Sequence, residues 1–188
     1  IGDVWYYFHE AGRMLTGWQM ISGTWVYFDE YGHWIKSGVT SITGTGNKTK
    51  EEMISFYEKS GFDYPSDALG KGGAPTLESF VQMYIEEAEA EGIRSDVAFA
   101  QSMLETGYLQ YGGDVQIEQF NFAGIGAVGG GASGASFADV RTGIRAHIQH
   151  LKAYANSESL KNACVDPRFA YVTRGSSPYV EWLGIKEN

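Results

Sequence analysis

An aromatic repeat at the start of the chain is the feature that most restricts what it can fold into. Ten of the 27 aromatic residues, including four of the five tryptophans, lie within the first 34 of 188 positions. A repeat of fixed length indicates stacked supersecondary units, which bury their apolar faces against one another. We therefore expect residues 1–39 to fold separately from the rest. The matching positions are Trp5 and Trp25, Gly12 and Gly32, Met14 and Trp34, and Gly17 and Gly38, with a period of 20 or 21.

Each repeat predicts a short antiparallel hairpin. The aromatic run over residues 25–28 is followed by a polar turn that ends in Gly32, and an aromatic or β-branched run bounded by such a turn is typical of hairpin strands. A single hairpin is only marginally stable, so about three units are normally needed. We expect this segment to be the end of a longer array.

Helical patterns begin after residues 40–50, which are rich in Thr, Ser and Gly and predict a linker. Thr49 with Glu52 three residues later resembles a capping box. Proline and glycine residues between positions 61 and 75 predict a loop. Residues 51–188 are therefore expected to form a second, mainly α-helical domain.

Two further helices are expected in this domain. Thr76 can cap a helix whose acidic residues, from Glu86 to Glu91, predict a solvated face. Ser95 and Gly107 bound the next helix, of about three turns.

Charge and composition exclude several classes of protein. The formal net charge is −9, and no basic cluster is present to neutralise phosphates, so we expect no nucleic-acid partner. The sequence contains no uninterrupted stretch of about 18 apolar residues, so we expect no membrane-spanning helix. His147 and His150 share a helix face but lack a third ligand for zinc, and Cys164 is a single cysteine. We expect no metal and no cofactor.

Glu105 is the strongest candidate for catalysis. It lies in the last turn of its predicted helix, at the edge of the apolar stripe. The negative end of the helix dipole and partial burial would both raise the pKa of this carboxyl group. A carboxyl group protonated near neutral pH can act as a general acid toward a departing glycosidic oxygen. The alternative is a surface glutamate that ends a helix.

The repeats resemble the choline-binding, or cell-wall-binding, repeats of Gram-positive surface proteins, on the strength of residues 16–28 (TGWQMISGTWVYF). The resemblance implies that rings from adjacent repeats enclose the trimethylammonium group of choline on teichoic acids, through cation–π contacts. Trp18, Trp25, Tyr27 and Trp34 match the ring positions. Alternatively, these rings only pack the hairpin onto the next domain.

The second domain resembles the glucosaminidases of glycoside hydrolase family 73, which have a lysozyme-like α-helical core. Together with the repeats, it is similar to secreted autolysins that separate daughter cells at the bacterial surface. The motifs that carry the resemblance are residues 98–107 (AFAQSMLETG), 121–126 (NFAGIG), 137–151 (FADVRTGIRAHIQHL) and 166–169 (DPRF).

The resemblance implies that Glu105 is the general acid and that peptidoglycan glycan strands are the substrate. Many members carry a second acid in a β-lobe, but residues 127–136, where we place this lobe, contain none. Asp114 is the preferred base, with Glu118 and Asp139 as alternatives, although Asp139 could equally cap the helix near Thr142. Assistance by the N-acetyl group of the substrate is equally open.

Several polar and aromatic residues are candidates for sugar contacts. The resemblance places Asn121 in the loop that lines the cleft, and Tyr171 could help to orient the N-acetyl group, although a packing role is an alternative. Aromatic residues near the motifs could stack on sugar rings or belong to the core: Tyr108, Tyr111, Phe120 and Phe122.

The expected activity is cleavage of the β-1,4 bond after N-acetylglucosamine. A lytic transglycosylase or muramidase would also be compatible with one catalytic glutamate on this core. The alternative that is not an enzyme is a wall-binding protein whose cleft no longer cleaves glycans.

Overall fold

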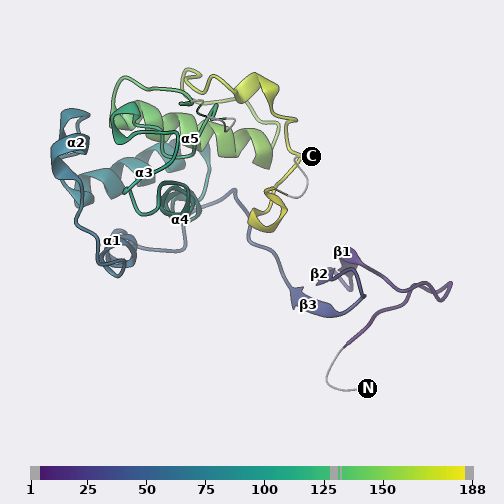
Figure 1. The fold of residues 1–188 in the computed structure, drawn as a ribbon. Coiled ribbons are helices and arrows are strands. Elements are labelled where there is room, and N and C mark those ends of the chain that lie inside the picture. The colour runs from purple at the N-terminus through teal and green to yellow at the C-terminus, as the bar shows by residue number, and fades with distance from the viewer. Residues whose placement is uncertain (1–4, 128–130, 132, 185–188) are drawn as a thin grey trace. The chain divides into compact units, whose positions relative to one another are not determined.

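The computed structural model describes residues 5–127, 131 and 133–184, and divides the chain into two compact units, Ile1–Thr40 and Ser41–Asn188. We call these the repeat unit and the helical unit. The described residues of the repeat unit carry a small antiparallel sheet, and those of the helical unit carry five α-helices (Figure 1). The fold is thus mainly α with a small β-sheet.

The repeat unit is built on three antiparallel strands in the order β1-β2-β3. Their bounds are β1 Gly17–Ile21, β2 Thr24–Phe28 and β3 Trp34–Ser37. The first hairpin turns at Ser22 and Gly23, whose φ angles of 48° and 79° suit the tight turn that matches the twist of paired strands.

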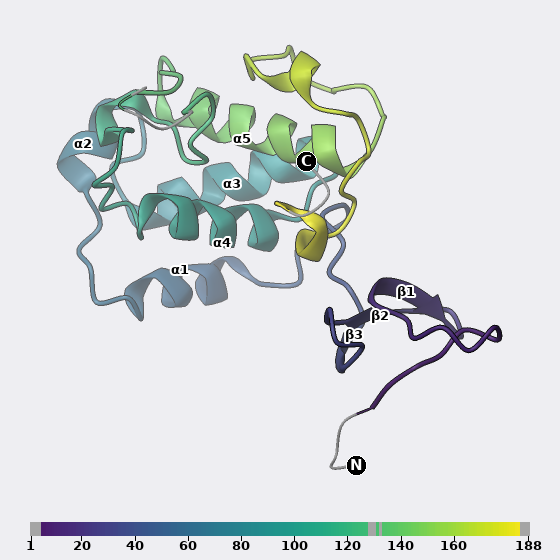
Figure 2. The same cartoon turned by 45° about the vertical axis from the view of Figure 1, so that its right-hand side comes forward.

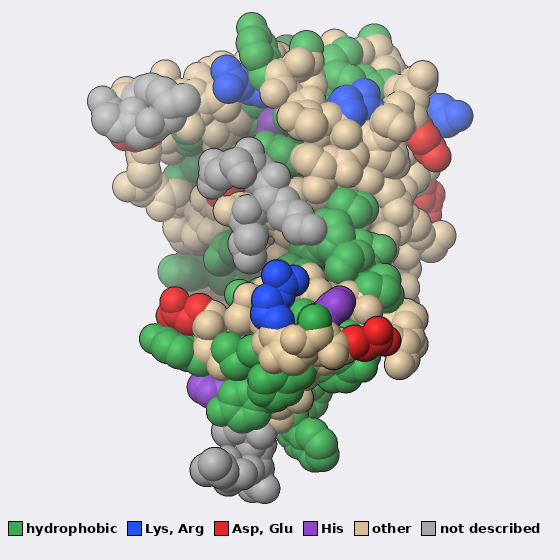
Figure 3. Space-filling view, turned by 90° about the vertical axis from the view of Figure 1, so that its right-hand side faces the viewer, with side chains coloured by type: hydrophobic (Ala, Val, Ile, Leu, Met, Phe, Trp, Pro, Cys, Tyr) green, Lys and Arg blue, Asp and Glu red, His purple; other side chains and the backbone are tan. Residues whose placement is uncertain are grey.

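Hydrophobic side chains of the repeat unit differ in exposure. Val26 and Phe28 are buried, whereas rings elsewhere in the repeat unit are open to solvent. In the lower part of Figure 3, hydrophobic side chains cover much of the drawn surface of this unit. The exposed large hydrophobic residues of the repeat unit are Trp5, Tyr6, Tyr7, Phe8, Met20, Tyr31, Trp34 and Ile35.

The helical unit packs around α3, which lies between α5 on one side and α1 and α4 on the other (Figure 2). Buried side chains from all five helices form one apolar core. The helices are α1 Lys50–Glu58, α2 Ser66–Lys71, α3 Leu77–Glu91, α4 Ser95–Thr106 and α5 Val140–Ala155, and short 3-10 turns occupy η1 Ile117–Gln119, η2 Phe169–Tyr171 and η3 Val180–Trp182.

Local sequence signals explain where several helices start and stop. Thr49 and Glu52 form the expected capping box of α1, and Thr76 caps α3. Gly107, in the left-handed conformation, ends α4. The loop expected over residues 61–75 is partly wrong, because α2 forms within it and buries Leu69.

The linker expected over residues 40–50 is also partly built into the helical unit. Ile42 is fully buried in the core of that unit. Its amide donates a hydrogen bond to the Pro178 carbonyl (3.1 Å), and its carbonyl accepts one from the Arg94 amide (2.9 Å). A Ser-, Thr- and Gly-rich composition did not reveal this single apolar anchor.

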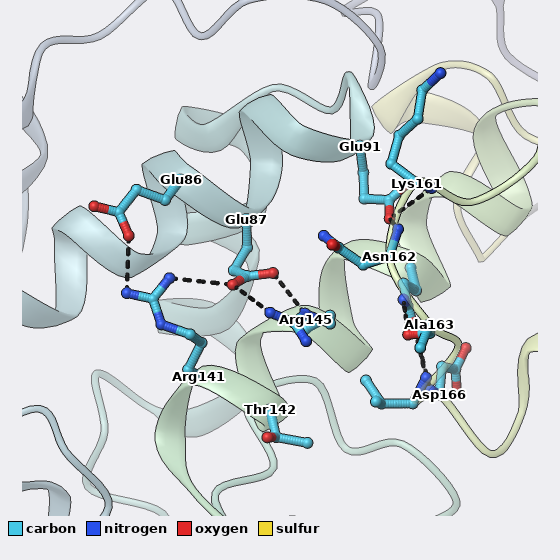
Figure 4. A network of polar contacts seen from close by, with 12 residues as sticks. Glu86, Glu87, Glu91, Arg141, Thr142, Arg145, Lys161, Asn162, Ala163 and Asp166 are labelled. Carbon is cyan, nitrogen blue, oxygen red and sulfur yellow. Dashed lines mark hydrogen bonds and ion pairs between the residues drawn. The ribbon is translucent and has the colours of Figure 1, made fainter.

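Ion pairs join α3 to α5, and hydrogen bonds join α3 to the segment after α5 (Figure 4). Glu87 accepts hydrogen bonds from Arg141 (3.1 Å) and Arg145 (2.8 Å). Glu91 pairs with the buried Lys152 (2.9 Å) and accepts bonds from the amides of residues 161 and 162. Glu87 and Glu91 are 4% and 2% exposed, so the prediction of a solvated acidic face is wrong for these two residues.

Candidate active site

The C-terminal end of α4 opens into a cleft of about 260 Å³. Glu105, in the last turn, is exposed and lies on the cleft wall. The expected partial burial of Glu105 is therefore wrong, while its place at the negative end of the helix dipole remains. The cleft is lined by Glu105, Thr106, Gly107, Tyr111, Gly113, Asp114, Val115, Asn121, Gly124 and Ala127.

Asp114 brings a second carboxylate to the same cleft. It is exposed, and its Oδ2 accepts a hydrogen bond from the Gly131 amide (3.4 Å). Residues 128–130 and 132, which belong to the segment where we placed the β-lobe, lie outside the described residues. In the described part of the helical unit, no strand is formed beyond isolated bridges.

Asn121 forms the cleft wall by holding a loop together. The side chain is 1% exposed. Its Nδ2 donates to the carbonyls of Ile125 (3.0 Å) and Ala135 (3.0 Å), and its Oδ1 accepts from the Ile125 amide (3.0 Å). Because its amide group is engaged within the protein, Asn121 shapes the cleft through the loop that it fixes.

Tyr111 is the predicted stacking residue that reaches the cleft. Its hydroxyl donates a hydrogen bond to the Asn121 carbonyl (3.4 Å). Burial raises the pKa of Tyr111 above its usual value, and the charge of Glu118 adds to this shift. The phenol therefore stays protonated at neutral pH and can act as a hydrogen-bond donor.

The other aromatic candidates lie elsewhere. Phe122 is fully buried against Phe80, with ring centroids 5.1 Å apart, so its assignment to substrate binding is wrong. Tyr108 packs on Phe56 (5.8 Å) and is absent from the described lining of the cleft. Phe120 is partly buried against the core.

Tyr171 is not brought to the cleft either. It is 75% exposed, and the Arg168 guanidinium lies over its ring at 4.7 Å. Figure 2 shows η2 near the C-terminal end of α5, whereas α4 ends at the opposite end of the helical unit. The described cleft lining therefore excludes it.

The alternative bases also take other positions. Asp139 caps α5 by accepting a hydrogen bond from the Thr142 amide (2.7 Å). Glu118 belongs to η1 and is not part of the described lining. Of the three candidate bases, the structure places Asp114 in the cleft with Glu105.

The two histidines of α5 are engaged in the core and at its edge. His147 is buried between the Tyr84 hydroxyl (3.1 Å) and the Gln101 side chain (3.0 Å). His150 pairs with Asp166 at 2.8 Å. Within the part of the chain that the structure describes, no three metal-ligating side chains cluster.

In the repeat unit, the sheet register aligns two candidate rings with a cation. Trp18 pairs with Tyr27, and Tyr27 pairs with Lys36. The Trp18 and Tyr27 ring centroids are 5.2 Å apart, and the Lys36 ammonium lies 5.3 Å from the Trp18 centroid. Trp25, two residues before Tyr27 on β2, points to the same face.

Trp34 lies outside this cross-strand row. It pairs with Phe28 beyond an irregularity in the register, and its indole donates to the Ser37 hydroxyl (3.2 Å). The ring is 44% exposed.

A family profile described as mannosyl-glycoprotein endo-beta-N-acetylglucosaminidase matches residues 81–183, more than half of the chain. The chain belongs to the glucosaminidase family. A second profile, that of the choline-binding repeat, matches residues 1–38. Membership of the glucosaminidase family supports glycoside hydrolysis in the helical unit.

One relative of this glucosaminidase is an uncharacterized protein of Borreliella burgdorferi. The two are 47% identical over 104 residues, which make up 55% of this chain and 51% of the relative. The chain thus spans about half the length of that relative. No solved structure matches this chain. In the described residues, no helix has the length and apolar character required to cross a bilayer.

Two residues that support the glucosaminidase cleft were missed by the sequence reasoning. Thr106 lines the cleft and is 3% exposed. Gln119 donates from Nε2 to the Ser133 carbonyl (2.6 Å), 14 residues later in the chain. Thr106 is adjacent to Glu105 and could have been singled out by that position, but nothing in the sequence marks the partner of Gln119.

Proposed function

We propose that this protein is a peptidoglycan endo-β-N-acetylglucosaminidase of the bacterial cell surface, which cleaves the β-1,4 bond after N-acetylglucosamine. The observation that carries the proposal is the presence of Glu105 and Asp114 in one cleft. The matching family profile and the helical core, which we interpret as lysozyme-like, support it. A role in daughter-cell separation accords with the presence of choline-binding repeats.

Glu105 is the proposed general acid. Glu105 lies in the last turn of α4, where the negative end of the helix dipole disfavours an additional negative charge. A glutamate that holds its proton near neutral pH can transfer it to the departing glycosidic oxygen. The exposure of Glu105 leaves room for a glycan strand to reach it.

Asp114 is the proposed base that activates water. A base of this kind acts across the scissile bond from the acid, in an oxocarbenium-like transition state. Tyr111, on the same cleft wall, can present its ring to a sugar. If the N-acetyl group of the substrate serves as the nucleophile, Asp114 would instead orient that group.

The repeat unit is proposed to hold the enzyme on choline-bearing wall polymers. Trp18, Trp25 and Tyr27 present rings on one face of the sheet, and a quaternary ammonium over such rings gains about 0.5–2 kcal/mol per contact. Trp34 would contribute at the exposed edge of the unit.

Digestion of purified peptidoglycan tests the proposed activity. Removing a general acid typically costs about 100- to 10,000-fold in rate, so Glu105→Gln should lower turnover by at least the smaller factor. Asp114→Asn should also lower it, if Asp114 activates water. Glu118→Gln is the matched control, because Glu118 is outside the described lining of the cleft, and it should keep the native rate.

Mass spectrometry of the products identifies the bond that is cut. Reducing N-acetylglucosamine ends are expected. Anhydromuramic ends would indicate a lytic transglycosylase, and reducing muramic ends a muramidase. Equal inactivity of the native chain and Glu105→Gln, with retained binding to the wall, would show a binding protein and refute the proposal.

A further inference from the structure

The turn between the two carboxylates has an unusual backbone. Tyr108, Leu109 and Tyr111 have φ angles of 57°, 62° and 57°. The left-handed region costs a residue with a side chain about 1–2 kcal/mol. Three such residues within four positions persist only where surrounding contacts hold them, and such strain is concentrated at functional sites.

Thr106 supplies two of the contacts that hold this turn. Its hydroxyl oxygen accepts a hydrogen bond from the Leu109 amide (2.9 Å), and its carbonyl accepts one from the Tyr111 amide (2.7 Å). The same hydroxyl donates to the Ser102 carbonyl in α4 (2.6 Å). Thr106 therefore ties two left-handed residues to the last turn of the helix that carries Glu105.

The position of this turn links the two walls of the cleft. It starts beside Glu105 and leads through Tyr111 to Asp114, and all three residues line the cleft. Leu109 is buried in the core and anchors the turn from below. A change in the turn would move the wall that carries Asp114 relative to Glu105, which stays on its helix.

We propose that Thr106 is a positioning residue that sets the spacing between Glu105 and the Asp114 wall. This inference rests on the proposed function, since it assigns the hydroxyl a role in the same reaction. The hydroxyl does not touch the reacting atoms in this assignment. It acts by fixing the turn, and a misplacement of about 1 Å in such a site can cost about 100-fold in rate.

Three variants of the full chain test this role. Thr106→Val keeps the side-chain shape but removes the hydroxyl, and should lower kcat by about 10- to 100-fold with KM within about twofold. Thr106→Ser restores the hydroxyl and should return kcat to within about threefold of the native value. Ser102→Ala is the matched control, because it removes a buried hydroxyl of α4 that bonds to the Phe99 carbonyl (2.8 Å) and leaves the turn intact.

Amide hydrogen exchange at Leu109 gives a readout that does not depend on activity. The Leu109 amide should exchange faster in Thr106→Val than in the native chain, and at the native rate in Thr106→Ser. If Thr106→Val does not fold, Thr106→Ala replaces it in both measurements.

The inference is overturned by a native kcat in Thr106→Val, by a failure of Thr106→Ser to restore it, or by an equal loss in Ser102→Ala. A native chain that leaves peptidoglycan uncut refutes the proposed function instead, and removes the catalytic role of Thr106 with it. In that case, amide hydrogen exchange at Leu109 still tests whether the Thr106 hydroxyl holds the turn.

Discussion

Lys36 shows how one side chain can alter a ligand site at the residue scale. Its ammonium lies 5.3 Å from the centroid of the Trp18 ring, on the row shared with Tyr27. A cation over an aromatic face is the interaction by which such rings would bind choline. Lys36 would therefore compete with a quaternary ammonium for the Trp18 ring.

Replacing Lys36 should make the variant bind choline more tightly than the native chain does. Exposed cation–π contacts are worth about 0.5–1 kcal/mol, so Lys36→Gln should lower the Kd for choline by about two- to fivefold, measured by calorimetric titration. Arg13→Gln removes another exposed cation of the repeat unit and should leave the Kd unchanged. A weaker or unchanged affinity in Lys36→Gln would show that Lys36 does not occupy the ligand position.

At the scale of secondary-structure elements, the close approach of α5 to the loop before the cleft depends on Gly143. A methyl group at this position would overlap the carbonyl oxygen of Phe120. Phe120 has a φ angle of 50° and directly precedes Asn121, which holds the cleft loop. Gly143 thus permits a contact between α5 and the backbone of the cleft wall.

Gly143→Ala should destabilise the protein although it improves the helix. Alanine is about 1 kcal/mol better than glycine in a helix interior, but the overlap with the Phe120 backbone can be relieved only by moving α5 or the loop. We expect the melting temperature, followed by far-ultraviolet circular dichroism, to fall by several degrees.

Gly70→Ala is the control for this prediction. A methyl group at Gly70 of α2 would lie 3.5 Å from the nearest atom of Pro75, an ordinary contact. Its melting temperature should be unchanged or higher. A Gly143→Ala protein as stable as the native one would mean that α5 is held less tightly against Phe120 than the structure indicates.

Local signals in the sequence predicted where helices begin and end better than they predicted the contacts between helices. The caps at Thr49, Thr76 and Gly107 were predictable because each acts within four residues of its own helix end. The burial of Glu87 was not, because its arginine partners lie more than 50 residues later on α5. A charged residue is rarely buried unless the fold brings an oppositely charged partner next to it. The spacing of residues along one helix does not show whether this happens.

The same limit applies to the site. Glu105 could be named as a candidate because it lies within a motif, and Asp114 because it lies between two motifs, and the structure brings them to one cleft. Phe122 sits in the same motif as Asn121, yet it packs into the core. Which side of a short irregular loop faces substrate depends on backbone angles that residue types do not specify, as the left-handed Tyr108 illustrates.

At the scale of the whole molecule, buried ionisable groups make the stability of the helical unit depend on pH. Burial lowers the pKa of His147 to about 3, and the nearby His150 adds to this shift. Burial alone would raise the pKa of Glu91, but hydrogen bonds from the amides of Asn162 and Lys161 and from Lys152 outweigh it, and the pKa is lowered.

These two shifts act in different pH ranges. An unfolded chain protonates His147 below about pH 6.5, while the native state does not until about pH 3, so native stability falls as the pH drops through this range. The contribution of Glu91 is present above its unfolded pKa, near 4.5, and is lost as the pH falls through its lower folded value. Between pH 7 and pH 4.5, His147 therefore contributes more than Glu91 to the loss of stability.

The free energy of unfolding should fall by roughly 2–3 kcal/mol between pH 7 and pH 4.5 through His147 alone, at about 1.36 kcal/mol per pH unit below the unfolded pKa. Urea denaturation followed by helical circular dichroism measures this fall. In His147→Gln, which cannot take up the proton, most of the fall should disappear even if the variant is less stable at pH 7. His9→Gln, at an exposed position of the repeat unit, should keep the native dependence. An equal fall in native and His147→Gln proteins would show that the buried imidazole is not the group that titrates on unfolding.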